Sequence, residues 1–190
     1  MGRMTETSFS LRTPEGDDVA RKICDTCGFV AYENPKIVVG SVVRHDGRIL
    51  LCRRAIAPRQ GFWTIPAGYL ELNETPEDGA RREAREEATA QLAIERLLAV
   101  YSVPRISQVQ LIYRASLAEP TIAPGIESQA VDLFAWDDIP WDELAFPSVH
   151  WALNHDRAAQ EGAPPVPFTN PDGATGNTMP DGRAQPVGEF

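Results

Sequence analysis

The sequence predicts a fold of the α+β or mixed α/β class, and three observations predict it. A nearly continuous run of β-branched and apolar residues at 37–43 indicates a buried strand. The stretch Thr75-Pro76-Glu77-Asp78 has the composition of a helix start, and further apolar runs of strand length follow that helix. Strands, one helix, more strands and a final helix, in this order, are typical of the class.

Each element follows from a local pattern. The turn His45-Asp46-Gly47 joins the first strand to a return strand, so the two should form a hairpin. Thr75 is the expected N-cap and Pro76 the first residue of a helix that runs to about Ala90. Strands are expected at 37–43, 48–54, 62–65, 94–100, 108–117 and 131–136, and a closing helix at 148–160.

The two ends of the chain differ in composition from its middle. A length of 190 residues suits one domain with tails. Residues 1–21 are polar, and we expect them to be disordered or loosely packed. Residues 162–190 hold six prolines and five glycines, so we expect a disordered tail there. The main domain should span residues 37–161.

Charge and composition exclude several classes of function. The chain has 18 basic and 27 acidic residues, a net charge of −9 and a pI of about 4.8. These values argue against binding to nucleic acid or to an anionic membrane. The sequence contains no apolar run of the ~18–20 residues that cross a bilayer, and its start lacks the apolar core of a signal peptide. Three cysteines do not make a disulfide framework, so we expect a cytoplasmic protein.

Three carboxylates gather on one face of the predicted helix. At about 100° per residue, Glu83, Glu86 and Glu87 share an arc of about 100°. Like charges at this spacing destabilise a helix, unless a hard divalent cation such as Mg²⁺ binds the oxygens. The alternative is a solvated helix face on which neighbouring arginines neutralise the acids.

The residues before and within this helix favour the metal-binding interpretation. Gly68, Glu74 and the run Arg82-Glu83-Ala84-Arg85-Glu86-Glu87 have the spacing of the Nudix box, so the chain resembles the Nudix hydrolase superfamily. It departs from the box at Thr89 and Ala90, where the family has glycine and an aliphatic residue, and at Ala84, where a larger apolar residue is usual. These positions affect helix packing and not metal ligation.

The resemblance extends over about residues 21–160. The segments that carry it are Cys24-Asp25-Thr26-Cys27-Gly28, Tyr32-Glu33-Asn34-Pro35-Lys36, Trp63-Thr64-Ile65-Pro66-Ala67-Gly68-Tyr69 and Ala145-Phe146-Pro147-Ser148. They resemble the Nudix branch that has an N-terminal zinc-ribbon-like segment and includes the plant chloroplast FAD and ADP-ribose pyrophosphatase. The resemblance implies an α/β/α sandwich with a mixed sheet, preceded by a zinc-ribbon-like remnant at residues 22–36.

The resemblance also implies a function. Nudix enzymes hydrolyse the diphosphate of a nucleoside diphosphate linked to another group, with Mg²⁺ or Mn²⁺. The expected substrate is a small nucleotide such as FAD, ADP-ribose or NADH, and the expected assembly is a homodimer. Two alternatives stay open: a house-cleaning pyrophosphatase for nucleoside triphosphates, and a ligand-sensing Nudix module without catalysis. The latter tends to lose box glutamates, and this chain keeps them.

Roles for the box residues follow from the same resemblance. Glu83 and Glu87 are the expected main metal ligands, and Glu86 adds a ligand or holds a metal-bound water. The carbonyl of Ala67 is a further expected ligand. The residues with structural roles are Gly68, Glu74 and Arg82.

Residues outside the box are candidates for the base and for substrate contacts. Glu127, in the loop before the strand at 131–136, is the candidate general base, although a loop acid is often only solvated. Arg53 and Arg54 end a strand shortly before the box, where a guanidinium can bridge phosphate oxygens, and the resemblance favours Arg54 for this role. The aromatic candidates for stacking on a base or flavin are Trp63, Tyr69 and Tyr113, although aromatic residues at strand positions are more often core residues.

Cys24 and Cys27 form half of a zinc knuckle. A structural zinc site needs four ligands, usually from two such pairs, and residues 1–23 contain no cysteine. We therefore expect two free thiols and no bound zinc.

Overall fold

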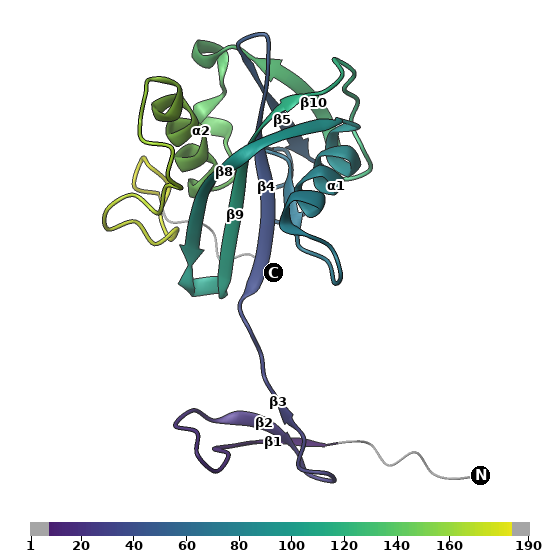
Figure 1. The fold of residues 1–190 in the computed structure, drawn as a ribbon, viewed down its shortest axis with the longest axis vertical. Helices are drawn as coiled ribbons and strands as arrows, with labels where there is room; N and C mark the ends of the chain where they lie inside the picture. Colours follow the sequence, from purple (N-terminus) through teal and green to yellow (C-terminus); the bar gives the residue numbers. More distant parts are fainter. Residues whose placement is uncertain (1–7, 184–190) are drawn as a thin grey trace, which may run out of the picture. The chain divides into compact units, whose positions relative to one another are not determined.

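The computed structural model describes residues 8–183, and the chain divides into two units, Met1–Pro35 and Lys36–Phe190. The smaller unit is a three-stranded antiparallel sheet of β1 (Phe9–Arg12), β2 (Arg21–Cys24) and β3 (Val30–Ala31), in the order β1-β2-β3 (Figure 1). The order found at β1 differs from the loosely packed segment expected over residues 1–21. The reason is that β1 gains its order from pairing with β2, from which the eight residues 13–20 separate it in the sequence. Residues 1–7 lie outside the described residues.

The larger unit is built on one mixed sheet. Its strands are β4 (Lys36–His45), β5 (Arg48–Arg54), β6 (Trp63–Thr64), β7 (Ala67–Tyr69), β8 (Leu92–Val103), β9 (Gln108–Leu117) and β10 (Ser128–Phe134). The main order is β10-β5-β4-β9-β8, with β6 paired to β5 and β7 to β4. β4 and β9 run parallel, and the other named strand pairs are antiparallel. The mixed sheet expected from the sequence is confirmed.

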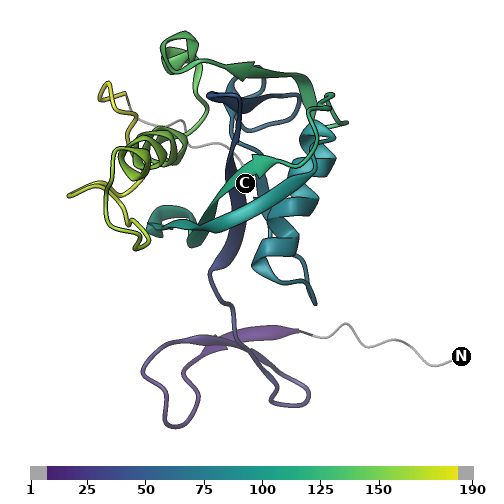
Figure 2. The same cartoon turned by 45° about the horizontal axis from the view of Figure 1, so that its top comes forward.

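The helices α1 (Pro76–Ala88) and α2 (Pro147–Gln160) cover opposite faces of this sheet, as Figures 1 and 2 show. Because side chains alternate along a strand, neighbouring residues of β4 and β5 enter different cores. The core beneath α1 includes Val43, Leu50, Cys52, Ala84, Ala88 and Ala115. The core beneath α2 includes Val42, Ile49, Leu51, Leu98, Trp151 and Leu153. The three layers form the expected α/β/α sandwich.

Local signals predicted most element boundaries. The Thr75 side chain accepts a hydrogen bond from the Asp78 backbone N–H, which confirms it as the N-cap of α1. α1 ends at a left-handed Thr89, slightly before the expected end at Ala90. The strand expected at 94–100 extends over 92–103, and β7 is a strand that the sequence did not predict. No helix within residues 8–183 is long and apolar enough to cross a membrane.

Three 3₁₀-helices complete the elements of the described part of the chain. They are η1 (Pro104–Ile106), η2 (Trp136–Asp138) and η3 (Trp141–Glu143). The first joins β8 to β9, and the other two lie between β10 and α2.

Residues 162–183 pack onto the larger unit and so differ from the disordered tail expected at 162–190. Phe168 exchanges backbone hydrogen bonds with β8: its N–H donates to Leu98 at 2.8 Å, and its carbonyl accepts from Val100 at 2.9 Å. The Asn170 side chain bonds both the N–H and the carbonyl of Ser102, at 2.9 and 2.8 Å. Met179 is buried. A few anchoring residues therefore order a segment whose average composition is that of a tail; residues 184–190 lie outside the described residues.

Candidate active site

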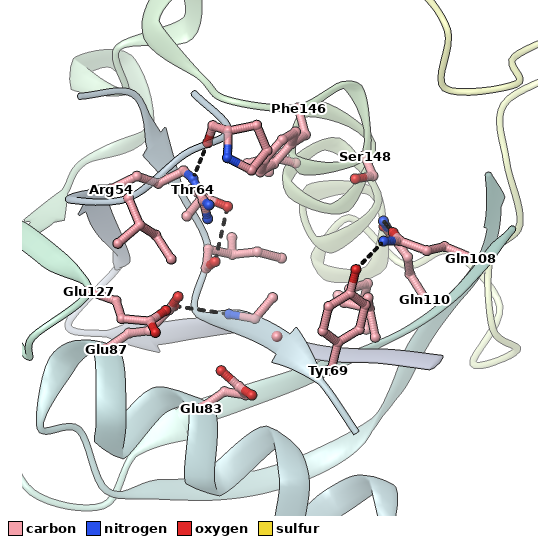
Figure 3. A pocket seen from close by; sticks show the side chains of 18 of the residues that line it. Arg54, Thr64, Tyr69, Glu83, Glu87, Gln108, Gln110, Glu127, Phe146 and Ser148 are labelled. Atoms are coloured by element: carbon pink, nitrogen blue, oxygen red, sulfur yellow. Dashed lines mark hydrogen bonds between the residues drawn. The ribbon is translucent and has the colours of Figure 1, made fainter. Parts of the chain in front are cut away.

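A cavity of about 980 Å³ opens beside α1 and the start of α2 (Figure 3). It is lined from β5, β7, α1, β9, the loop before β10, and the loop and first turn of α2. The sequence-predicted site residues that line it are Arg54, Ala67, Gly68, Tyr69, Arg82, Glu83, Glu86, Glu87 and Glu127. Residues far apart in the sequence thus converge on one space.

Helix α1 presents two buried carboxylates to the cavity. Glu83 and Glu87, one helical turn apart, are 9% and 6% exposed. One Glu87 carboxylate oxygen accepts a hydrogen bond from the Ala67 backbone N–H at 3.1 Å. The Glu83 carboxylate lies against Gly68, where an added Cβ would be 2.4 Å from one of its oxygens. Strand β7 therefore holds one carboxylate by a hydrogen bond and makes room for the other.

Burial raises the pKa values of both carboxyl groups. It raises the pKa of Glu87 to about 8, helped by the charges of Glu83 and Glu127, while the Ala67 N–H and Arg54 act in the opposite direction. Burial also raises the pKa of Glu83, against the lowering effect of Arg82. Carboxyl groups whose pKa values are raised by burial within a cavity are typical of functional sites, although structural sites also perturb pKa values.

Arg82 connects the loop before α1 to the carboxylate face of the helix. Its guanidinium makes two hydrogen bonds to Glu74, at 2.7 and 3.1 Å, and one to the Tyr69 carbonyl at 2.9 Å. A further nitrogen contacts Glu83 at 2.7 Å and Glu86 at 3.0 Å. The Glu74 partner raises the pKa of Arg82, so the side chain stays a cation. This geometry supports the expected structural roles of Glu74 and Arg82.

The loop before β10 brings Glu127 to the cavity. Gly125 in this loop touches the backbone of α1, since a Cβ added there would lie 1.6 Å from the Glu86 carbonyl oxygen. Its N–H donates to the carbonyl of Glu87 at 3.0 Å. Glu127 and Glu87 both line the cavity and are on the same side of the view in Figure 3, and the charge of Glu127 acts on Glu87. Gly125 was not predicted as a site residue. The need for glycine at this position comes from the close approach of the loop to α1, which only the structure shows.

Arg54 supplies positive charge to the same cavity. Its Nε donates to the Pro58 carbonyl at 2.8 Å, and its guanidinium lies 5.3 Å from the centroid of the Phe146 ring. Burial lowers the pKa of Arg54, while Glu87 and Glu127 act to raise it. These contacts fix the guanidinium beside the carboxylates, where it can donate to phosphate oxygens.

Only one of the three aromatic candidates lines the cavity. Tyr69 lines the cavity. Trp63 does not, because its ring packs edge-on against Phe134 at 4.9 Å within the α2 core. Tyr113 is 5% exposed and packs with Val39 and Ala80 on the α1 side of the sheet. Neither Trp63 nor Tyr113 is placed to stack on a ligand in the cavity, which corrects both expectations.

The residues around the carboxylates fit a hard divalent cation by their chemistry. Glu83, Glu86, Glu87 and Glu127 all line the cavity and offer carboxylate oxygens, the ligands that Mg²⁺ and Mn²⁺ prefer. Within residues 8–183, no three acidic, histidine or cysteine side chains are already arranged around a common metal position. The burial of Glu83 and Glu87 at one cavity is the observation that favours a cation here, since its charge would offset the cost of ionising both side chains.

The smaller unit does not fit a structural zinc ion. Cys24 is buried and Cys27 exposed, both are free thiols, and the remaining cysteine, Cys52, lies in the core of the other unit. Between the pair, Asp25 accepts hydrogen bonds from the hydroxyls of Ser8, at 2.9 Å, and Ser10, at 2.6 Å. Two thiols provide half of the four ligands that such a zinc needs. Hydrogen bonds to Asp25 join β1 to the knuckle instead.

Comparison with known families agrees with this geometry. A family model described as NUDIX domain matches residues 34–154, and a zinc-ribbon model described as Nudix N-terminal matches residues 6–33. The crystal structure of a NUDIX hydrolase from Nitrosomonas europaea is 43% identical, with a TM-score of 0.82, and the match covers 88% of this chain and 96% of that one.

Curated relatives match a smaller part of the chain. A MutT-like protein from Streptomyces ambofaciens is 38% identical over 102 residues, which is 54% of this chain and 64% of that protein. An ADP-ribose pyrophosphatase from Methanocaldococcus jannaschii is 28% identical over 119 residues, 60% of this chain and 69% of that protein. With the domain model matching most of the larger unit and a structure of the same architecture at 43% identity, this chain belongs to the NUDIX domain family of hydrolases.

Proposed function

We propose that this protein hydrolyses the diphosphate of a nucleoside diphosphate linked to a second group, with ADP-ribose, FAD and NADH as the first candidates. One observation carries the proposal: Glu83 and Glu87 are buried, have raised pKa values and share a cavity with Arg54. A cavity of about 980 Å³ is large enough for a dinucleotide-sized ligand. ADP-ribose ranks first because a relative that is 28% identical is an ADP-ribose pyrophosphatase.

The side chains divide the chemical work among them. Glu83 and Glu87, with Glu86 and the Ala67 carbonyl, would hold Mg²⁺ or Mn²⁺. When bound, such a cation lowers the pKa of a water and neutralises charge on the phosphoryl oxygens. The N–H of Ala67 orients the Glu87 carboxylate, and the Arg54 guanidinium donates to the outer phosphate oxygens.

Glu127 is the proposed general base. It lines the same cavity as Glu87, on a loop that is fixed against α1 by the hydrogen bond of Gly125. From this place its carboxylate would take the proton of the attacking water. Glu127→Gln should lower kcat by about 10²-fold or more while metal binding, measured by Mn²⁺ titration, stays intact. A loss of only a few-fold would remove Glu127 from this role.

A substrate panel with Mg²⁺ tests the activity itself. The panel compares ADP-ribose, FAD and NADH with several nucleoside triphosphates, and products are identified by chromatography. Glu87→Gln should abolish hydrolysis, whereas Glu119→Gln, an exposed acid outside the cavity, should not change it. Preference for triphosphates would favour the house-cleaning alternative, and binding without turnover would favour the ligand-sensing module. Activity that survives Glu87→Gln would refute the metal assignment.

The assembly and the location of the protein stay predictions. We propose a homodimer that acts on small nucleotides in the cytoplasm. Light scattering at micromolar concentration tests the assembly, and a monomer mass would reject it.

A further inference from the structure

The cavity has a second polar region, away from the carboxylates. Gln108 and Gln110 on β9 both line it, and residues two apart on a strand point to the same face. Gln108 is only 9% exposed. Figure 3 shows the two glutamines together with Tyr69 and Ser148 on one side of the view, and Glu83, Glu87 and Glu127 on the other. Neither glutamine belongs to the Nudix box, so the roles proposed above leave both without a function.

A chain of hydrogen bonds fixes the two amides. The Gln108 Nε2 donates to the Tyr69 hydroxyl at 3.3 Å, and the Gln110 Nε2 donates to the Gln108 Oε1 at 3.3 Å. The Lys36 ammonium lies 5.1 Å from the centroid of the Tyr69 ring and holds the phenol in turn. An amide has two N–H donors and one carbonyl acceptor. After these bonds, Gln110 still has a carbonyl and one N–H to offer to a ligand.

Apolar side chains lie beside the amide pair. Val103, Ile106 and Ile112 line the same part of the sheet and of the η1 turn. Polar groups in such a place are costly unless they are paired, and a ligand that pairs with them gains both binding strength and selectivity. A flat, apolar-faced ligand with a polar edge has the matching chemistry, and a nucleobase is such a ligand.

We propose that Gln108 and Gln110 form the subsite that recognises the adenine base of the substrate. A glutamine amide can pair with adjacent donor and acceptor atoms, as it does with the N6 amino group and N7 of adenine. Guanine presents two acceptors, O6 and N7, on the same edge, and these suit a cation. The two arginines that line the cavity, Arg54 and Arg82, are both engaged near the carboxylates. This proposal deepens the proposed function and rests on it for the position of the diphosphate.

The first experiment compares two substrates on the unaltered protein. ADP-ribose and its hypoxanthine counterpart have the same sugar and diphosphate, but hypoxanthine has an oxygen in place of the N6 amino group. We expect kcat/KM to favour the adenine compound by about 10- to 100-fold, mostly through KM. Equal kcat/KM values for the two substrates would refute adenine recognition.

Variants then assign the preference to the amides. Gln110→Met keeps the length of the side chain and removes its hydrogen bonds, so it should raise KM for ADP-ribose by about 10-fold and leave kcat within about twofold. Gln108→Met should do the same, and Gln91→Met, at an exposed position outside the cavity, is the matched control. If melting temperatures show that both cavity variants are folded, and both retain the wild-type preference for adenine, then the amide pair does not recognise the base.

A binding measurement separates this inference from the proposed function. Saturation-transfer NMR with AMP and IMP on chelator-treated full-length protein requires no hydrolysis. We expect signals from the AMP base protons that are several-fold stronger than those of IMP and are lost in Gln110→Met. This result together with no hydrolysis of any diphosphate would refute the proposed function and retain the base subsite. Hydrolysis of ADP-ribose with no difference between the AMP and IMP signals would support the proposed function and refute the base subsite.

Discussion

We expect Gly68→Ala to disable hydrolysis by displacing the Glu83 carboxylate. A Cβ at position 68 would lie 2.4 Å from one Glu83 carboxylate oxygen and 2.5 Å from the other. Gly68 does not have a positive φ, so alanine meets no backbone strain there. The carboxylate of Glu83 is therefore the main obstacle to the substitution.

The size of the effect follows from this overlap. Nonbonded heavy atoms are comfortable at about 3.5 Å, so the carboxylate would have to retreat by about 1 Å. A misplacement of about 1 Å in a catalytic geometry can cost about 10²-fold in rate. We therefore expect kcat/KM for ADP-ribose to fall by about 100-fold, which corresponds to about 2.7 kcal/mol of transition-state stabilisation.

A double-mutant cycle tests the cause of this loss. Glu83→Asp withdraws the carboxylate from position 68 by one methylene. In that background, Gly68→Ala should therefore lower kcat/KM by less than about fivefold. The assay is kcat/KM with Mg²⁺ for the wild type, both single variants and the double variant, with melting temperatures as the control for folding. A folded Gly68→Ala variant within threefold of wild-type activity would falsify the assigned position of Glu83.

Three further outcomes follow from other contacts. In chelator, the wild type should lose on the order of 3 kcal/mol of stability between pH 4.5 and 7, because a folded-state pKa of about 8 for Glu87 makes its ionisation costly; melting curves of Glu87→Gln should lack this loss. Chelator should leave hydrogen exchange at the Cys24 amide unchanged, because two thiols do not hold a structural zinc, whereas Asp25→Ala should speed this exchange, because it removes the bonds from Ser8 and Ser10. Faster exchange in chelator would mean that a metal stabilises the smaller unit. Asn170→Ala should cost about 1–3 kcal/mol of local stability, seen as faster exchange at the Val100 amide, whereas unchanged exchange would mean that Phe168 docks without it.

The box helix could be predicted from sequence because its signals are local. The Thr75 cap and Pro76 set where α1 begins, and helical geometry alone then puts Glu83 and Glu87 on one face. The contact that orients Glu87, from the Ala67 N–H, depends on the pairing of β7 with β4. The motif identified this region, but only the fold gives the carboxylates their burial and their raised pKa values.

The errors over aromatic residues have a different cause. Alternation along β9 separates Gln108, Gln110 and Ile112 from Tyr113, but the sequence does not say which face borders the cavity. That choice is made by partners distant in the chain: Tyr113 lies between Ser41 of β4 and Leu97 of β8, and faces α1. The same dependence on distant partners kept the glutamine pair out of the sequence-based prediction.

The strand β8 stands at the end of the main sheet, and Phe168 covers part of it. A terminal strand offers unpaired amide and carbonyl groups to any neighbouring molecule, which is a common route to aggregation. The backbone hydrogen bonds of Phe168 to Leu98 and Val100, and the side-chain hydrogen bonds of Asn170 to the Ser102 backbone, satisfy several of these groups. Shortening the chain to the 34–154 match of the domain model would uncover them, so the trimmed protein should self-associate even though every box residue remains.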